Sequence, residues 1–206
     1  MKNYKFYLSD IDADTSLKNA SSIALDGEFS GLNPLTDKLH LLQLCDGSDF
    51  VHLIKFEGKY NAPNLKKILE NNKIKKILHY GRADLGFLKR HLDINVTNIF
   101  DTKIASKISR KFSPHHGLKD LCRDLISVNL SKEHQTSDWG KKIEEYSEDQ
   151  IKYACKDVLY LHKIRDELEK ILKREYKLEL AEQCFKFLET RTALDLVGLS
   201  EDIFEH

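Results

Sequence analysis

One short stretch, residues 22–32, constrains this chain more than any other. It begins as a strand, in which Ile23 and Leu25 alternate with a second set ending in Asp26 and Glu28. Because a strand has a period of two, both carboxylates point to the same face of the sheet. They repel each other unless a cation lies between them, and oxygen ligands suit Mg²⁺ and Mn²⁺. The alternative is a pair of solvated acids at a strand end, so a metal site requires further ligands.

The charge balance limits what the chain can bind. Its 206 residues fit one domain, or one domain with an appendage. Lys plus Arg equal Asp plus Glu at 33 each, so the formal net charge is zero. Proteins that bind long nucleic acids usually carry a basic excess, because affinity comes from neutralising many phosphates. A neutral chain therefore favours a short nucleic acid substrate or none.

The cysteines and the N-terminal residues indicate the compartment. The four cysteines form no Cys-x-x-Cys pair, and their spacing is typical neither of a zinc site nor of a disulfide framework. The first residues lack the apolar segment of a signal peptide, and no apolar run approaches the ~20 residues that span a bilayer. We therefore expect a cytoplasmic protein with free thiols and no membrane association.

The order of the expected elements is that of a mixed α/β protein with a helical end. Two apolar runs flank Asp46-Gly47, a strong hairpin signal, so the sheet should open with three antiparallel strands after a short edge strand at Tyr4–Leu8. Pro63 suits a first helical turn, and Asp101 can cap a later helix. The expected strands cover residues 22–29, 39–45, 50–54, 75–79 and 96–100, and the expected helices cover 62–71, 83–92, 102–109, 117–126, 148–173 and 175–190.

Two further acids lie where an apolar residue would be expected. Asp84 shares a helical stripe with Phe87 and Leu88, and Asp157 follows Tyr153 by one helical turn. An acid on an apolar stripe is costly unless a charged group meets it. The alternatives are a first-turn acid that interacts with the helix dipole, and a half-buried Asp beside a core Tyr.

Taken together, the acids form a pattern. Four occur in order on a strand, a helix and a later helix: Asp26, Glu28, Asp84 and Asp157. This pattern resembles the DEDD superfamily of exonucleases. One branch of the superfamily has a His five residues before the last acid, where this chain has Lys152; the other has a Tyr four residues before it, as Tyr153 is here. The chain therefore resembles the RNase D-like 3′–5′ exonucleases.

Several stretches resemble a narrower group, the compact bacterial nanoRNase C proteins. They cover residues 77–85, 102–107, 116–119, 131–132, 135, 137–139 and the tail around 193–196. The resemblance implies an α/β, ribonuclease H-like fold with a mixed five-stranded sheet. It also implies one exonuclease domain over residues 1–206, with a core to about residue 173 and a C-terminal helix and tail over about 174–206. The chain after Asp157 is too short for the helical repeats of full-length RNase D.

The resemblance implies hydrolysis of a phosphodiester by two divalent cations, Mg²⁺ or Mn²⁺. The four acids would hold the two ions ~4 Å apart, which activates a water and stabilises the leaving oxygen. Tyr153 would orient or deprotonate that water, and an unperturbed pKa near 10 favours orientation. Gly27 departs from the family, which usually has Thr there. We expect a side chain at this position to point away from the metals, so that catalysis survives.

Candidate substrate-binding residues follow from the same resemblance. Leu32 matches a leucine that wedges between two bases, although it could be an ordinary core residue. His79 and Arg82 flank the site and could contact phosphate, although His79 could equally be a satisfied strand-end residue. Trp139 could stack on a base or belong to the core. The remaining candidates are Gly27 and three polar residues that could cap a 5′-phosphate: Lys132, Gln135 and Ser137.

Three functions remain open at this point. The first is hydrolysis of very short RNA, above all 5′-phosphorylated dinucleotides, to mononucleotides. The second is RNase D-like trimming of longer RNA such as tRNA 3′ ends, against which the neutral charge weighs. The third is a non-catalytic RNA-binding module, disfavoured because all four acids and Tyr153 are present. The resemblance also implies a ring-like homo-oligomer, an octamer in that group, with the C-terminal helices and apolar tail as a candidate interface.

Overall fold

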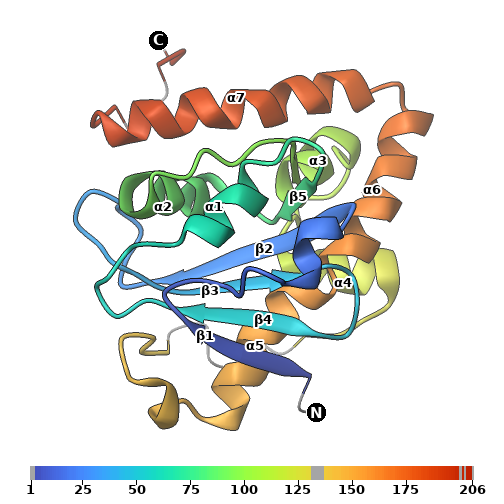
Figure 1. Cartoon of the computed structure of the whole chain (residues 1–206). Helices are drawn as coiled ribbons and strands as arrows, with labels where there is room; N and C mark the ends of the chain where they lie inside the picture. The colour runs from blue at the N-terminus through green and yellow to red at the C-terminus, as the bar shows by residue number, and fades with distance from the viewer. Residues whose placement is uncertain (1–2, 131–136, 200, 202, 206) are drawn as a thin grey trace.

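A six-stranded sheet organises the described part of the chain, residues 3–130, 137–199, 201 and 203–205 of a computed structural model (Figure 1). The strand order is β1-β4-β3-β2-β5-β6. Strands β2, β3 and β4 are antiparallel, whereas β1–β4, β2–β5 and β5–β6 are parallel pairs. The bounds are β1 (Tyr4–Leu8), β2 (Ser22–Phe29), β3 (Leu39–Cys45), β4 (Val51–Lys55), β5 (Lys75–Leu78) and β6 (Ile99–Asp101).

The sheet contains the predicted hairpin and one strand more than the predicted count. Strands β3 and β4 pair on either side of the Asp46-Gly47 turn, where Gly47 has a φ of 94°. That left-handed conformation suits a glycine. The prediction of five strands is wrong, because the edge strand β1 pairs in parallel with β4 along its whole length and becomes the sixth.

Helices cover both faces of the sheet (Figure 1). On one face α1 (Pro63–Leu69) and α2 (Arg82–Leu92) bury a core that includes Leu25 of β2. On the other face α5 (Glu148–Leu159) buries Ala24 of the same strand, together with Trp139. Alternate residues of β2 therefore enter two different cores, as the period of a strand requires. Two short 3-10 helices also occur, η1 (Ser16–Asn19) and η2 (Ile143–Glu145).

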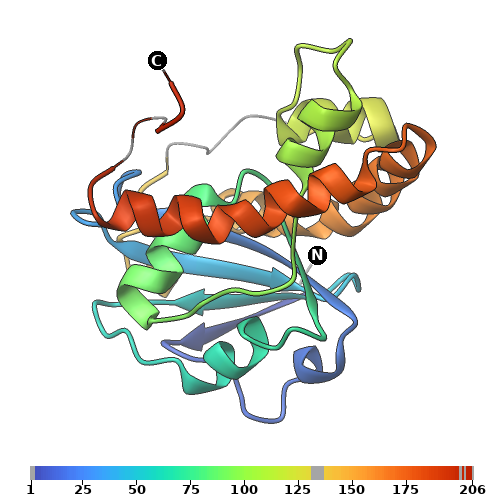
Figure 2. The same cartoon turned by 90° about the horizontal axis from the view of Figure 1, so that it is seen from above.

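A helical layer closes the β6 end of the molecule. It consists of α3 (Thr102–Ser109), α4 (Leu118–Ile126), α6 (Leu161–Arg174) and α7 (Leu178–Leu196), and its core includes Phe100 and Phe185. Asp101 caps α3 as predicted, because its Oδ1 accepts the backbone N–H of Ile104 at 2.9 Å. Viewed from above, α7 crosses over α2, and its C-terminal end lies beside the loop that follows β2 (Figure 2).

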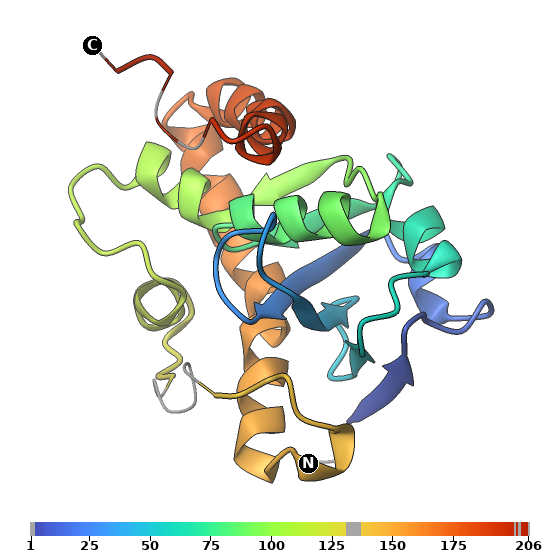
Figure 3. The same ribbon diagram turned by 90° about the vertical axis from the view of Figure 1, so that its left-hand side faces the viewer.

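Three predicted boundaries need correction. The helix expected over 148–173 is two helices, α5 and α6, which follow one another along one side of the sheet (Figure 3). They separate at Tyr160, whose backbone N–H bonds to the Val158 carbonyl instead of continuing the α-helical pattern. Strand β6 starts at Ile99 instead of residue 96, and α7 continues to Leu196 instead of ending near 190. Among the described residues no helix is long and apolar enough to cross a membrane.

Candidate active site

The end of β2 is where the sheet opens. Pairing between β2 and β5 covers only Ser22 to Ala24, whereas β3 stays paired with β2 as far as Phe29. Beyond Ala24, β2 therefore has a neighbour on one side only. Asp26 and Glu28 lie in this section, just before a β-bulge between Glu28 and Phe29. The opening leaves room for side chains from the helices on either face.

Helix α2 supplies the third predicted acid. It begins directly after β5, and Asp84 lies in its first turn. The start of the helix is fixed by Asp101, whose Oδ2 accepts the backbone N–H of Gly81 at 2.8 Å. The Asp84 side chain is 5% exposed, and its Oδ1 accepts no hydrogen bond from the described residues. An orphaned carboxylate oxygen in a buried position is costly, and a bound cation would remove that cost.

Helix α5 supplies the fourth acid and the tyrosine. Carboxylate oxygens of Asp26, Glu28 and Asp157 all lie within 4.8 Å of one another. Tyr153, one turn before Asp157, makes a side-chain hydrogen bond with it. The sequence-predicted acids of β2 and α5 therefore meet at the open end of β2, as the pattern implied.

The electrostatics of this cluster are those of like charges in a poorly solvated place. Burial raises the pKa of Asp26 to about 7. Burial also raises the pKa of Glu28, Asp84 and Asp157 well above the ordinary value, and the charge of Asp26 raises each of them further. The pKa of Tyr153 is raised by burial and by the charge of Asp157, so its hydroxyl keeps its proton at neutral pH.

These residues fit divalent cations. The donor set consists of carboxylate oxygens only, which is what hard cations such as Mg²⁺ prefer. The orphaned Oδ1 of Asp84 and the mutual repulsion in the cluster are both relieved when positive charge is present. Asp26, Glu28, Asp84 and Asp157 are therefore the residues that would hold such ions.

Gly27 does not behave as predicted. A Cβ atom at this position would lie 3.1 Å from Oδ1 of Asp84, so it would point toward an acid of the site instead of away from it. The same Cβ would lie 2.7 Å from Cζ of Phe29, whose ring stacks on Phe87 with centroids 3.9 Å apart. The Phe29 ring thus occupies the space that a side chain at position 27 would need.

Gln43 is a residue of the site that the sequence analysis missed. It lies on β3 opposite Asp26, and it is fully buried. Its Nε2 donates to Oε1 of Glu28 at 3.3 Å, while its own Oε1 accepts no hydrogen bond from the described residues. The sequence does contain a sign of this role. Gln43 is a polar residue in an apolar strand, on the same face as Leu41 and Cys45.

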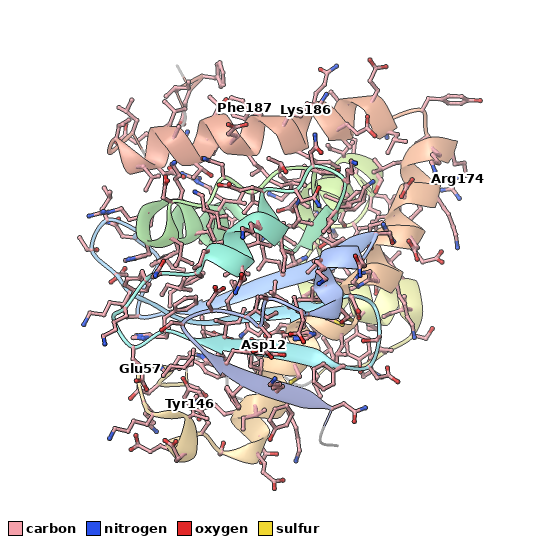
Figure 4. All side chains as sticks on the ribbon, in the orientation of Figure 1. Asp12, Glu57, Tyr146, Arg174, Lys186 and Phe187 are labelled. Atoms are coloured by element: carbon pink, nitrogen blue, oxygen red, sulfur yellow. The ribbon has the colours of Figure 1, made fainter. Side chains whose placement is uncertain are left out.

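Leu32 and Trp139, each predicted as either a core residue or a substrate contact, differ in exposure. Leu32 is 82% exposed, so the core alternative is wrong for it. Trp139 is 3% exposed and packs edge-on against Tyr146, so base stacking is wrong for it and the core alternative holds. Tyr146, at the lower part of Figure 4, donates its hydroxyl to the Trp139 carbonyl at 2.7 Å, and Lys55 donates to the same carbonyl at 2.6 Å.

His79 is held at the strand end. The Thr102 hydroxyl donates to the Leu78 carbonyl, so His79 Nδ1, 2.9 Å from Thr102 Oγ1, must be the donor of that pair. Burial lowers the pKa of His79 to about 3, which leaves a neutral ring whose Nε2 is an acceptor. In this tautomer the ring offers no donor to a phosphate oxygen, which favours the alternative of a satisfied strand-end residue, and the phosphate contact stays a prediction.

Arg82 and the polar loop complete the predicted set. Arg82 lies at the start of α2 and forms two hydrogen bonds with Asp195 of α7. Ser137 is half-buried in the irregular segment that leads to Trp139. Lys132 and Gln135 lie outside the described residues.

Comparisons with known proteins agree with this geometry. A family model described as 3'-5' exonuclease matches residues 12–173. The solved structure of Brucella melitensis NrnC bound to pGG is 40% identical, with a TM-score of 0.93 over 99% of this chain and 98% of that one. A structure of the same Brucella protein with bound Mg2+ gives a TM-score of 0.92 at 39% identity.

Longer proteins share the same region. Escherichia coli RNase D, an exoribonuclease, is 26% identical with a TM-score of 0.79, over 92% of this chain and 50% of that one. DNA polymerase I of Aquifex aeolicus is 30% identical over 177 residues, which are 86% of this chain and 28% of the polymerase. This chain thus spans half or less of these two relatives. It belongs to the 3′–5′ exonuclease family, a class of hydrolases that need divalent metal ions.

Proposed function

We propose that this chain hydrolyses very short RNA, above all 5′-phosphorylated dinucleotides, to mononucleotides. The observation that carries the proposal is the match over almost the entire length of a protein solved with pGG, whose letters describe two guanosines with a 5′-phosphate. The exposed side chain of Leu32 supports it. This leucine lies four residues after Glu28, at a cavity of about 650 Å³, where it can enter between two bases.

The site residues take roles that their surroundings support. The four acids, Asp26, Glu28, Asp84 and Asp157, would hold two divalent cations, Mg²⁺ or Mn²⁺. When bound, such ions make a water nucleophilic and stabilise the charge of the leaving 3′-oxygen. Tyr153 keeps its proton and shares it with Asp157, so it would orient the attacking water by accepting a hydrogen bond from that water, a role that fits it better than that of a general base.

A length series tests the substrate proposal. The full chain would be given 5′-labelled RNAs of two to seven nucleotides with Mg²⁺, and initial rates would be compared. We expect the dinucleotide to be cleaved at least tenfold faster than the seven-mer, because the proposed 5′-phosphate contacts suit the terminal phosphate of a dinucleotide and not the internal phosphodiester of a longer strand. Leu32→Ala should reduce that ratio, while Leu8→Ala, at another exposed leucine, should leave it unchanged. Equal rates on all lengths would sink the proposal.

The second candidate is trimming of longer RNA, favoured by the likeness to RNase D. It predicts the opposite length series, with rates that rise with RNA length. The neutral net charge weighs against it, since long RNA is bound through many phosphates.

We further propose a single exonuclease domain, a cytoplasmic location and a homo-oligomer, ring-like and with eight copies as in the family group. The free cysteines, three of them buried, fit a reducing compartment. Exposed apolar side chains on α7, in the connection before it and in the tail support an interface there: Tyr176, Leu180, Phe187, Val197, Leu199 and Phe204. Phe187 lies on the outer side of α7 in Figure 4. Sedimentation as a monomer at micromolar concentration would contradict the oligomer.

A further inference from the structure

Helix α7 lies beyond residues 12–173, the range matched by the general exonuclease family, yet it contacts Arg82, one of the predicted substrate-binding residues. Asp195, in its last turn, accepts two hydrogen bonds from Arg82. Arg82 Nε donates to Oδ2 at 2.8 Å, and Nη2 donates to Oδ1 at 2.7 Å. This two-point contact fixes both the plane and the direction of the guanidinium group. It joins residues 113 positions apart in the chain.

A second arginine strengthens the contact from within α7. Arg191 Nη2 donates to Oδ1 of Asp195 at 3.1 Å, and Arg191 also bonds to the carbonyl of Leu199. The side chains of Arg191 and Asp195 are each 13% exposed, whereas Arg82 is 36% exposed. The carboxylate of Asp195 is therefore buried and held in place, and Arg82 is the most exposed of the three side chains.

Arg82 and Asp195 line the same cavity as Leu32 and Tyr80. None of the four acids lines this cavity, but it shares two chain segments with them, since Leu32 follows Glu28 by four residues and Arg82 precedes Asp84 by two. Figures 1 and 2 both place the C-terminal end of α7 next to the loop after β2. The volume of the cavity, about 650 Å³, is within the range of small-ligand sites. The charged residues that line the cavity are Asp37, Arg82 and Asp195, so the guanidinium of Arg82 is the cationic group that this lining offers to a ligand.

We propose that Asp195 is a positioning residue, which holds Arg82 at the cavity wall so that the guanidinium binds a phosphate of the RNA fragment. The proposal rests on the proposed function of the site. A free arginine side chain samples many rotamers, so fixing it beforehand removes an entropic cost of binding. The last turn of α7 thereby becomes part of the substrate site of this chain.

The test compares Asp195→Asn with wild type, as full chains with Mg²⁺, on the RNA length that wild type cleaves best. We expect KM to rise about tenfold, the loss of one charge-assisted hydrogen bond, with kcat within about twofold of wild type. Asp93→Asn is the matched control, an exposed acid at the other end of α2 that pairs with Lys66 and Lys89, and it should leave KM unchanged.

A double-mutant cycle separates positioning from a merely structural tie between α7 and α2. If Asp195 acts through Arg82, Arg82→Lys combined with Asp195→Asn raises KM no further than Arg82→Lys alone. Asp195→Glu, which keeps the charge, should recover part of the loss. Unchanged KM with a lower melting temperature makes the contact structural only and overturns the proposal. A lower KM also overturns it, because Asp195 would then withdraw Arg82 from the substrate. Since every variant is compared on the substrate that wild type prefers, failure of the dinucleotide proposal is seen separately.

Discussion

The two faces of β2 near its C-terminal end differ sharply. One face carries Asp26 and Glu28, whose charges repel each other and the charge of Asp157. The other face carries Gly27 and Phe29, where an aromatic ring fills the space of a missing side chain and stacks on Phe87. The comparison teaches that an electrostatically unfavourable cluster is kept in place by close packing behind it. Substitutions on the two faces should therefore fail in different ways.

The largest effect is expected on the charged face. Asp157→Asn keeps the shape of the side chain but removes a charged cation ligand, so kcat should fall by more than about 10³-fold, since bound metal supplies several kcal/mol of transition-state stabilisation. Steady-state kinetics with Mg²⁺ measures this. Asp149→Asn, on the exposed side of the same helix, is the control and should keep wild-type activity. An Asp157→Asn variant with a tenth of wild-type activity would remove this acid from the proposed metal site.

Metal removal should expose the repulsion itself. The folded-state pKa of Asp26, about 7, lies above that of an unfolded Asp, so its contribution to stability is present at low pH and is lost as pH rises through 7. The metal-free protein should therefore melt at a lower temperature at pH 8 than at pH 6.5. Buried histidines with a lowered pKa have the opposite effect, since they make the melting temperature rise with pH, and they act below pH 6.5.

Asp26→Asn is the variant for this measurement. In EDTA at pH 8 it should melt several degrees above wild type, and added Mg²⁺ should stabilise it less than wild type. Asp12→Asn, an exposed acid that pairs with Lys5, serves as the control. If Asp26→Asn melts below wild type in EDTA, repulsion does not govern this face.

The sequence predicts the charged face much better than its surroundings. Strand and helix periods alone place Asp26 with Glu28 and Tyr153 with Asp157, because each pair lies within one element. Period says nothing about which residue of another strand lies opposite, so Gln43 was missed, although it is only one strand away. The contact between Asp195 and Arg82, 113 positions apart, was not predicted for the same reason.

Exposure is likewise a tertiary property. The sequence left two roles open for both Leu32 and Trp139, a core residue or a contact with the substrate. In the structure Leu32 is exposed and Trp139 is buried, because only Trp139 packs against the helices. The strand period predicts that a side chain at position 27 would point to the face opposite Asp26 and Glu28. It does not predict that Asp84 reaches that face, which depends on the separation of β2 from β5 after Ala24.

Gln43 tests whether the charged face needs its own support. Gln43→Met has a similar volume but cannot donate to Glu28, so we expect Mg²⁺ affinity to fall about 10- to 100-fold, the usual cost of losing an outer-sphere partner. Calorimetric titration of Mg²⁺ into the protein measures affinity without relying on activity. Leu42→Met, on the opposite face of β3, is the control. Wild-type affinity in Gln43→Met would mean that Glu28 is oriented without this amide.

The smallest effect is expected on the packed face. In Gly27→Ala the new methyl group would lie 2.7 Å from Cζ of Phe29, and the ring cannot recede because Phe87 is stacked behind it. Overpacking of this kind costs about 1–3 kcal/mol, which denaturant unfolding measures. Gly117→Ala, with an ordinary φ of −71° and only a flexible Asp nearby, should be close to neutral. Adding Phe29→Leu should restore stability to Gly27→Ala, because the smaller side chain frees the space. Full stability of Gly27→Ala by itself would show that the ring moves aside without cost, and the contrast between a repelling face and a rigid one would then be lost.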